Sequence, residues 1–228
     1  TRRLVEAARP KPVLFFGARQ DFWGAQPGDG FAAHTGGASS VSTDAQASLF
    51  GGTGIGTVPH SLIAAYSGDT VRASQAFATH CPGVDLIALV DYENDCVRTS
   101  LEVARALEGR LWGVRLDTSE NLVDKSVITQ MGAFRPTGVN PPLVWNVRNA
   151  LDAEGFGEVK IVVSGGLNAT RVKEFEDEKA PVDVYAVGTS LVHDGRFDFT
   201  SDVVMVDAEE QAKVGRELRA NPKLDRVR

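Results

Sequence analysis

The sequence predicts an α/β protein that folds as a distorted barrel of parallel strands. Three observations lead to this class: short β-branched runs, helical patterns between them, and polar or glycine residues directly after the runs. Strands buried on both faces of a parallel sheet read as nearly continuous apolar runs. Periodicity alone does not separate a barrel from an open sheet, and we favour the barrel. The expected strands span 13–16, 86–90, 111–116, 159–163 and 182–187.

Helical patterns alternate with these strands. We expect helices near 95–108, 142–151 and 169–179, with a loop rich in glycine and proline over 131–142. Residues 1–196 are expected to form the barrel. Residues 197–228 are expected to be a C-terminal extension that turns polar and basic after one apolar run and returns to the surface.

Composition limits the classes of partner. The chain has 228 residues, a formal net charge of −6 and no long basic run, which argues against nucleic acid and against an anionic membrane surface. No apolar run is long enough to span a bilayer. The two cysteines, Cys81 and Cys96, fit reduced thiols in a cytoplasmic protein. The chain starts without Met, so we expect a processed product or a fragment.

Two glycine turns predict a phosphate site. Ser164-Gly165-Gly166 follows one expected strand and Gly188-Thr189 follows the next. Glycine lets the backbone approach a phosphate, and the helix start behind it offers free N–H groups. One such turn by itself is more often only a tight turn. Two turns at neighbouring strand ends favour phosphate, because ligands of parallel α/β folds bind at that end of the strands.

A second glycine-rich segment, 54–61, carries Thr57 and His60 three residues apart. His60 can act as a base, as a proton donor or as a phosphoryl acceptor. The alternative is a histidine that only starts a helix, and this motif is weak when taken alone.

Charged residues also stand at the expected strand ends. Arg115 precedes Asp117 by two positions and can bind a carboxylate through two parallel hydrogen bonds, or it can form a structural pair with Asp117. Arg19, just after the first strand, has the same two readings. Asp91 and Asp117 could hold Mg²⁺ or ribose hydroxyls, and they could equally cap helices.

Taken together, these segments resemble the nicotinate phosphoribosyltransferase family. The matching segments occur in the family's order and span most of the chain, and Gly-Thr-x-x-His with Arg-Leu-Asp-Thr is the most specific part. They are Phe16-Gly17-Ala18-Arg19, Thr35-Gly36-Gly37, Gly56-Thr57-Val58-Pro59-His60-Ser61, 88–91, 114–118, 159–166 and 187–189. The resemblance implies a type II phosphoribosyltransferase barrel with ligands at the strand C-termini.

The resemblance also implies roles for individual residues. His60 matches a histidine that ATP phosphorylates, and we place it with Asp117 in the catalytic machinery. Arg19, Thr57 and Arg115 match contacts to nicotinate. The resemblance assigns the phosphate-bearing sugar, 5-phosphoribosyl diphosphate, to the two glycine turns. The residues of these turns are Ser164, Gly165, Gly166, Gly188 and Thr189.

The implied reaction joins nicotinate to the donor sugar with release of diphosphate, using Mg²⁺ and ATP, in NAD biosynthesis. Three departures from the family pattern stand out: its N-terminal domain is missing, Gln20 replaces a second arginine, and Ser39 replaces an aspartate. The extension 197–228 could therefore return to that missing domain, and a homo-oligomer or a partner N-terminal domain is expected.

Three rival functions remain open at this stage. One is a relative specific for nicotinamide or quinolinate, although quinolinate needs further basic residues for its second carboxylate, and no clear set is present. Another is a non-catalytic barrel fragment that needs a partner chain. The third is an unrelated phosphate-binding barrel such as an aldolase, which would need a strand-end lysine, whereas Lys160 stands at the start of its strand.

Overall fold

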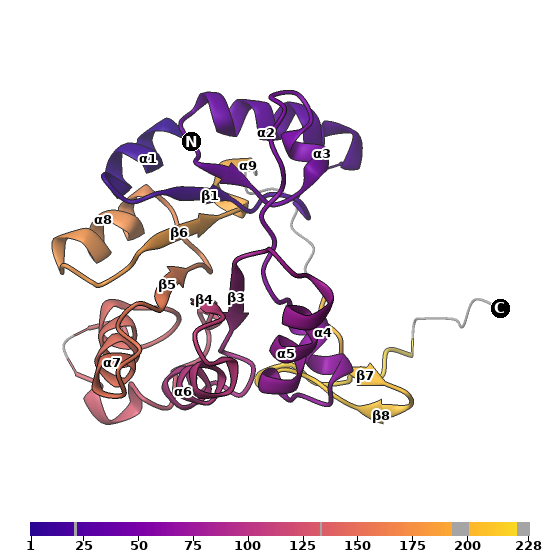
Figure 1. Cartoon of the computed structure of the whole chain (residues 1–228), viewed down its shortest axis with the longest axis vertical. Helices are drawn as coiled ribbons and strands as arrows, with labels where there is room; N and C mark the ends of the chain where they lie inside the picture. The colour runs from indigo at the N-terminus through magenta and orange to yellow at the C-terminus, as the bar shows by residue number, and fades with distance from the viewer. Residues whose placement is uncertain (21, 133, 193–200, 223–228) are drawn as a thin grey trace.

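The structure is a computed structural model that describes residues 1–20, 22–132, 134–192 and 201–222. Six parallel strands form one sheet in the order β2-β1-β6-β5-β4-β3. Figure 1 shows the sheet curling into a half-barrel, with the strands inside and the helices around them. The predicted fold class is therefore confirmed. The strands are β1 (Val13–Phe15), β2 (Ser40–Val41), β3 (Leu86–Leu89), β4 (Leu111–Leu116), β5 (Lys160–Val163) and β6 (Val184–Val187).

All five expected strands are present, and one strand of this sheet was missed. β2 has only two residues and no apolar run, so nothing in its composition distinguishes it from a loop. Its place follows from pairing, because Leu14 and Phe15 of β1 align with Ser40 and Val41. β2 and β3 are the two edges of the sheet.

Helices cover the outer face of the sheet. The expected helices correspond to α6, α7 and α8, and Asp95, Asn140 and Asn168 accept hydrogen bonds at their starts. The helices are α1 (Arg2–Ala8), α2 (Gln26–Thr35), α3 (Asp44–Ala47), α4 (His60–Ala65), α5 (Thr70–His80), α6 (Cys96–Leu107), α7 (Pro141–Ala153), α8 (Ala169–Asp177) and α9 (Thr189–Val192). Two 3₁₀ turns, η1 (Trp23–Ala25) and η2 (Ile128–Gln130), complete the set in the described part of the chain.

Two apolar layers hold the half-barrel together. The larger layer lies between the strands and the outer helices and includes Leu116, Leu143 and Phe175. The smaller layer fills the inside of the curl, where Leu14, Ile87 and Val162 meet. Strand side chains alternate between these layers with period two, so β1, β3, β4, β5 and β6 each contribute to both. This packing fixes the strand ends that carry the polar residues.

A linking segment joins the two edges of the sheet at the carboxyl ends of the strands. The backbone N–H of Ile55 donates to the carbonyl of Val41 on β2, at 2.8 Å. The N–H of Val58 donates to the carbonyl of Ile87 on β3, at 3.1 Å. The glycine-rich segment thus crosses from the edge strand β2 to the edge strand β3 and carries Thr57 between them.

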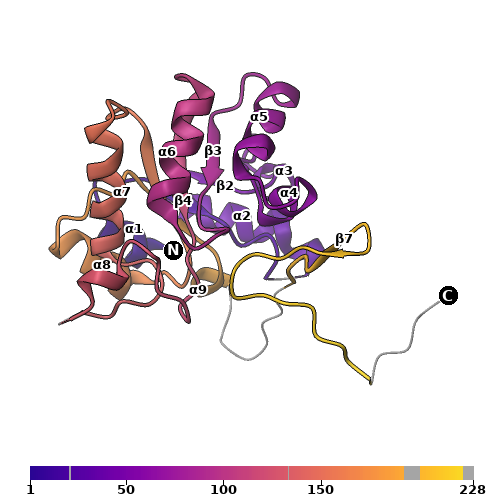
Figure 2. The same ribbon diagram turned by 90° about the horizontal axis from the view of Figure 1, so that it is seen from below.

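The C-terminal segment packs against the barrel. Residues 201–222, which we call the strap, contain the hairpin β7 (Met205–Val206) and β8 (Glu209–Glu210), and they run beside α4 (Figures 1 and 2). Val203 and Val206 pack on the apolar cluster around Ile63. The expectation of a surface tail is wrong for Lys213, which is 7% exposed. The predicted boundary at 196/197 lies outside the described residues.

Within the described ranges, no helix is long and apolar enough to cross a membrane.

Candidate active site

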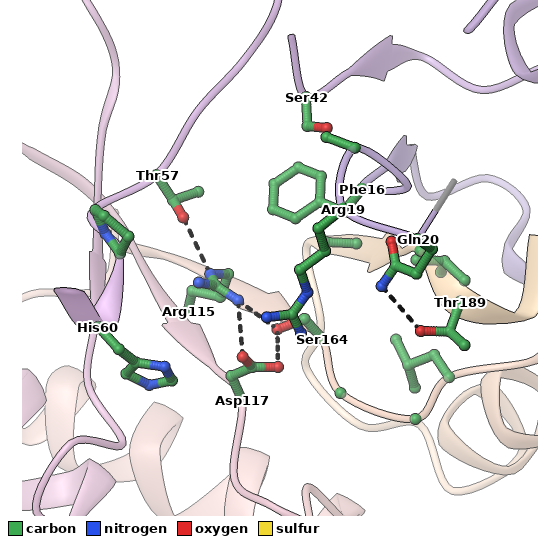
Figure 3. Close-up of a pocket in the computed structure, with 18 of the residues that line it drawn as sticks. Phe16, Arg19, Gln20, Ser42, Thr57, His60, Arg115, Asp117, Ser164 and Thr189 are labelled. Atoms are coloured by element: carbon green, nitrogen blue, oxygen red, sulfur yellow. Dashed lines mark hydrogen bonds and ion pairs between the residues drawn. The ribbon is translucent and has the colours of Figure 1, made fainter. Parts of the chain in front are cut away.

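A pocket of about 950 Å³ opens at the carboxyl ends of the strands. Its walls come from the segments after β1, β4, β5 and β6, from the linking segment and from the strap. All predicted site residues except Asp91 line it (Figure 3). They are Arg19, Thr57, His60, Arg115, Asp117, Ser164, Gly165, Gly166, Gly188 and Thr189.

Arg115 is held at the centre of this pocket by three neighbours. Its Nε donates to Thr57 Oγ1 at 3.1 Å, and its Nη1 donates to Ser164 Oγ at 3.0 Å. Nη1 also lies 3.1 Å from Asp117 Oδ2. Arg115 therefore lines the pocket and at the same time forms the structural pair with Asp117. These contacts fix the plane of the guanidinium before any ligand arrives.

An aromatic ring and a second arginine stand beside Arg115. The guanidinium carbon of Arg115 is 5.9 Å from the centre of the Phe16 ring. Arg19 points into the same space in Figure 3, and Gln20 Nε2 donates to Thr189 Oγ1 at 3.0 Å. Phe16 and Gln20 were not among the predicted site residues. Both residues lie in the segment that directly follows β1. Because the residues after the other strands were predicted to line a ligand site, this position was the signal that could have identified them.

The two glycine turns have different physical causes. Gly165 and Gly166 have φ of +82° and +61°, values that favour glycine. A Cβ on Gly166 would meet nothing within 4 Å, so this turn leaves open space beside the backbone. A Cβ on Gly188 would lie 2.4 Å from the carbonyl oxygen of Phe16. Gly188 is therefore required by close packing of β6 against β1, whatever it binds.

His60 is the first residue of α4 and contacts a buried carboxylate. Its Nε2 lies 2.9 Å from Asp91 Oδ1, and the side chains are 22% and 0% exposed. An ionised carboxylate only accepts hydrogen bonds, so Nε2 carries the proton and Nδ1 keeps its lone pair in the neutral ring. The helix-start reading is thus correct as a position, and the ring has a further contact that the sequence did not show.

Asp91 has a second partner from the far end of the chain. Lys213, on the strap, forms an ion pair with Asp91 Oδ2, and its Nζ lies 3.4 Å from the carbonyl oxygen of Asp117. Burial alone would raise the pKa of Asp91. The hydrogen bond from His60 and the positive charge of Lys213 outweigh burial and lower this pKa to about 2. No sequence signal pointed to Lys213, because it stands in a polar tail 122 residues after Asp91.

Asp91 and Asp117 were both candidates for a magnesium ligand, and the structure gives them different surroundings. Both oxygens of Asp91 are engaged, one by His60 and one by a lysine ammonium group, and the side chain is fully buried. Asp117 faces the pocket and is 23% exposed, so it remains the predicted carboxylate for this role. Across the described residues, no group of three or more His, Cys, Asp or Glu side chains could hold a metal ion.

The curled half-barrel of parallel strands has the fold of the type II phosphoribosyltransferases. A solved structure of nicotinate-nucleotide pyrophosphorylase from Pyrococcus furiosus aligns with a TM-score of 0.71 and 34% identity, over 94% of this chain and 51% of that one. Nicotinate phosphoribosyltransferase pncB2 of Mycobacterium tuberculosis is 32% identical over 196 residues, which is 83% of this chain and 37% of that protein. The chain belongs to the nicotinate phosphoribosyltransferase family.

Further comparisons agree on the fold. The structure of nicotinate phosphoribosyltransferase from Porphyromonas gingivalis aligns with a TM-score of 0.62 at 16% identity, over 86% of this chain and 49% of that chain. No protein-family model matches the sequence. The chain spans between a third and a half of the length of these relatives.

Proposed function

We propose that this chain carries the catalytic site of a nicotinate phosphoribosyltransferase, which joins nicotinate to 5-phosphoribosyl diphosphate and releases diphosphate. The observation that carries the proposal is the position of Arg115. Its guanidinium is oriented by Thr57, Ser164 and Asp117, beside an aromatic ring and next to the Gly165-Gly166 turn. The pocket thus holds an oriented guanidinium that can bind a carboxylate, and it also holds a glycine turn of the kind that binds phosphate.

Nicotinate would bind beside Arg115 and Phe16. Nε and Nη1 of Arg115 make the contacts described above, which leaves Nη2 to donate to the carboxylate of the pyridine acid. The flat pyridine ring can stack on Phe16, because aromatic rings favour offset contact. Arg19 reaches the same space and supplies a second positive charge.

The donor sugar would bind at the turns after β5 and β6. The N-terminus of α8 and the Gly165-Gly166 backbone both face the pocket and favour an anion. Mg²⁺ commonly binds through one or two carboxylates plus substrate phosphates, and Asp117 is the carboxylate placed for this. The metal would offset the charge of the leaving diphosphate. The protein's own contribution is to align the pyridine nitrogen with the sugar carbon.

The coupling to ATP would use His60. Because Nε2 faces Asp91, Nδ1 is the nitrogen that can attack the terminal phosphoryl group of ATP. A new N–P bond would form as the bond to ADP breaks, and water would later release phosphate. His60 lines the donor pocket, so a phosphoryl group there would change the charge that the diphosphate meets.

Among the rivals, a dicarboxylic substrate is less well supported. The arginine and lysine side chains that line the described pocket are Arg19 and Arg115. If Arg115 binds one carboxylate, Arg19 must serve both a second carboxylate and the phosphates. A monocarboxylic acid fits this set of charges better.

The direct test is product formation by the full chain. Incubation with nicotinate, 5-phosphoribosyl diphosphate, Mg²⁺ and ATP should yield nicotinate mononucleotide and diphosphate, measured by chromatography. Quinolinate and nicotinamide serve as matched competing substrates. A folded chain that binds none of the three, or that turns over only quinolinate or nicotinamide, contradicts the proposal.

The phosphohistidine has its own test. Labelled ATP should give an acid-labile phosphoprotein, and His60→Ala should abolish the label. His34 stacks on the ring of Phe50 away from the pocket, so His34→Ala is the matched control and should keep the label. Equal labelling of the His60→Ala chain would contradict the assignment.

A further inference from the structure

Lys213 is a buried cation that the proposed reaction does not use. It comes from the strap, is 7% exposed, and pairs with Asp91, which is fully buried. Figures 1 and 2 show the strap running along the barrel beside α4, the helix that His60 begins. A lysine is rarely buried unless it is paired, because removal of an ammonium group from water is costly.

Anchoring the strap does not require this ion pair. Val203 and Val206 already pack on the barrel, Gln211 Nε2 donates to the Tyr92 hydroxyl at 2.9 Å, and the N–H of Val214 donates to the Tyr92 carbonyl, also at 2.9 Å. Buried ion pairs often stabilise a protein no better than apolar side chains of similar size. The strap therefore has enough ordinary contacts, and the lysine needs another explanation.

The explanation lies in the charge that Asp91 requires. A fully buried carboxylate needs a nearby positive charge to stay ionised. Asp91 has two neighbours that can supply it, His60 on one oxygen and Lys213 on the other. If His60 supplied the charge, its ring would be protonated on both nitrogens and could not act as a nucleophile.

The other titratable groups around this pair do not supply that charge. Cys96, at the start of α6, is a neutral thiol, because burial raises its pKa well above the usual value. Asp124 accepts a hydrogen bond from the backbone N–H of Cys96, and as an acid it cannot supply a positive charge. Asp117 is an acid that pairs with Arg115, and the phenol of Tyr92 cannot become a cation. Lys213 is the cation in direct contact with Asp91.

We propose that Lys213 is a positioning residue that supplies the counter-charge of Asp91, so that His60 stays a neutral ring with its proton on Nε2 and a free lone pair on Nδ1. The role of that lone pair as a phosphoryl acceptor rests on the proposed function. The protonation state itself does not. The strap thus completes the site from a position 153 residues after His60 in the chain.

The test is the protonation of His60, measured by ¹⁵N NMR on the full chain with labelled histidine and assigned with the His60→Ala chain. At pH 7 the wild-type ring should show one protonated nitrogen, Nε2, and one unprotonated nitrogen. In Lys213→Met the ratio of imidazolium to neutral ring at pH 7 should rise about tenfold, because a positive charge near the ring has been removed. Lys213→Arg should restore the wild-type spectrum.

Gln211→Ala is the matched control. It removes a strap contact to Tyr92 and leaves Asp91 untouched, so its spectrum should match wild type. A change of equal size in Gln211→Ala would show that docking of the strap, and not the charge of Lys213, sets the state of His60. An unchanged spectrum in a folded Lys213→Met chain would overturn the proposal.

The test still decides if the Lys213→Met chain does not fold, and it is separate from the test of the phosphohistidine. If Lys213→Met does not fold, the wild-type titration still decides, since an imidazolium at pH 7 in the wild type contradicts the proposal. If the NMR results are as expected but ATP leaves no label on His60, the proposed phosphohistidine fails while the role of Lys213 stands. If both hold, labelling of Lys213→Met should slow in proportion to the loss of the neutral ring.

Discussion

Asp91 and Asp117 stand at the carboxyl ends of neighbouring strands, yet their surroundings differ. Asp117 pairs with Arg115, two positions earlier in the chain, and lies 2.8 Å from Ser164 Oγ on the next strand. Asp91 pairs with Lys213 from the strap and with His60 from α4. The first pair lines the pocket, whereas the second lies behind it with Asp91 fully buried.

This difference separates two tasks that look alike in the sequence. The Arg115–Asp117 pair is partly exposed and presents an oriented cation to a ligand. The Lys213–Asp91 pair presents nothing to a ligand directly and acts on His60. A strand-end aspartate can therefore support a binding group or a reacting group, and the origin of its cation decides which one.

The largest expected effect is on stability. Asp91→Asn would leave Lys213 buried without a counter-charge, which costs about 3–5 kcal/mol. Asp117→Asn keeps an acceptor for Ser164, and Arg115 keeps Thr57, so the cost should be about 1 kcal/mol. Urea unfolding of the Asp91→Asn and Asp117→Asn variants, compared with the unchanged chain, measures both losses of unfolding free energy. Equal losses would remove the distinction between the two sites.

The next effect is on substrate choice. Arg115→Ala should lower kcat/KM for nicotinate by the equivalent of about 2–5 kcal/mol, because a charged pair with the carboxylate is lost. Lysine should rescue poorly, since it lacks the planar fork that Thr57 and Ser164 orient. Steady-state kinetics with nicotinate and nicotinamide provide the measurement. If Arg115→Ala retains the full preference for the acid, Arg115 is only the structural partner of Asp117.

The smallest expected effect is on acid stability. The pKa of Asp91 is about 2 in the folded chain, below its ordinary value of 3.8. Its contribution to stability is therefore present above pH 4 and is lost as the pH falls through 2, a change of about 2 kcal/mol. Unfolding free energies across this window should fall by that much less in Asp91→Asn than in the matched variant Asp117→Asn. Parallel curves for the two variants would contradict the assignment.

Local patterns were enough to predict most of the barrel. The β-branched runs around Val162 and Ala186 predicted β5 and β6, and the helical pattern over 169–179 predicted α8 between them. Because the carboxyl ends of parallel strands meet at one edge, the same patterns placed Arg115, Ser164 and Thr189 in one pocket. Strand β2 was missed because two residues carry too little pattern.

The reason for each glycine was not visible in the sequence. Gly166 and Gly188 both follow buried strands and looked equivalent. The structure gives Gly166 a positive φ with open space beside it, and gives Gly188 a backbone neighbour at 2.4 Å. Such close approaches join residues far apart in the chain, so a local pattern carries no record of them.

By itself the sequence determined the parallel α/β class, the strand ends and ten of the residues that line the pocket, because these depend on apolar runs and on the first residues after them. Only the tertiary structure decided that Asp91 is enclosed between His60 and Lys213. That arrangement depends on the strap returning across the barrel to bring a lysine from a polar tail into a buried site. Contacts between distant residues are fixed by packing of the whole chain, and no periodicity near Lys213 encodes them.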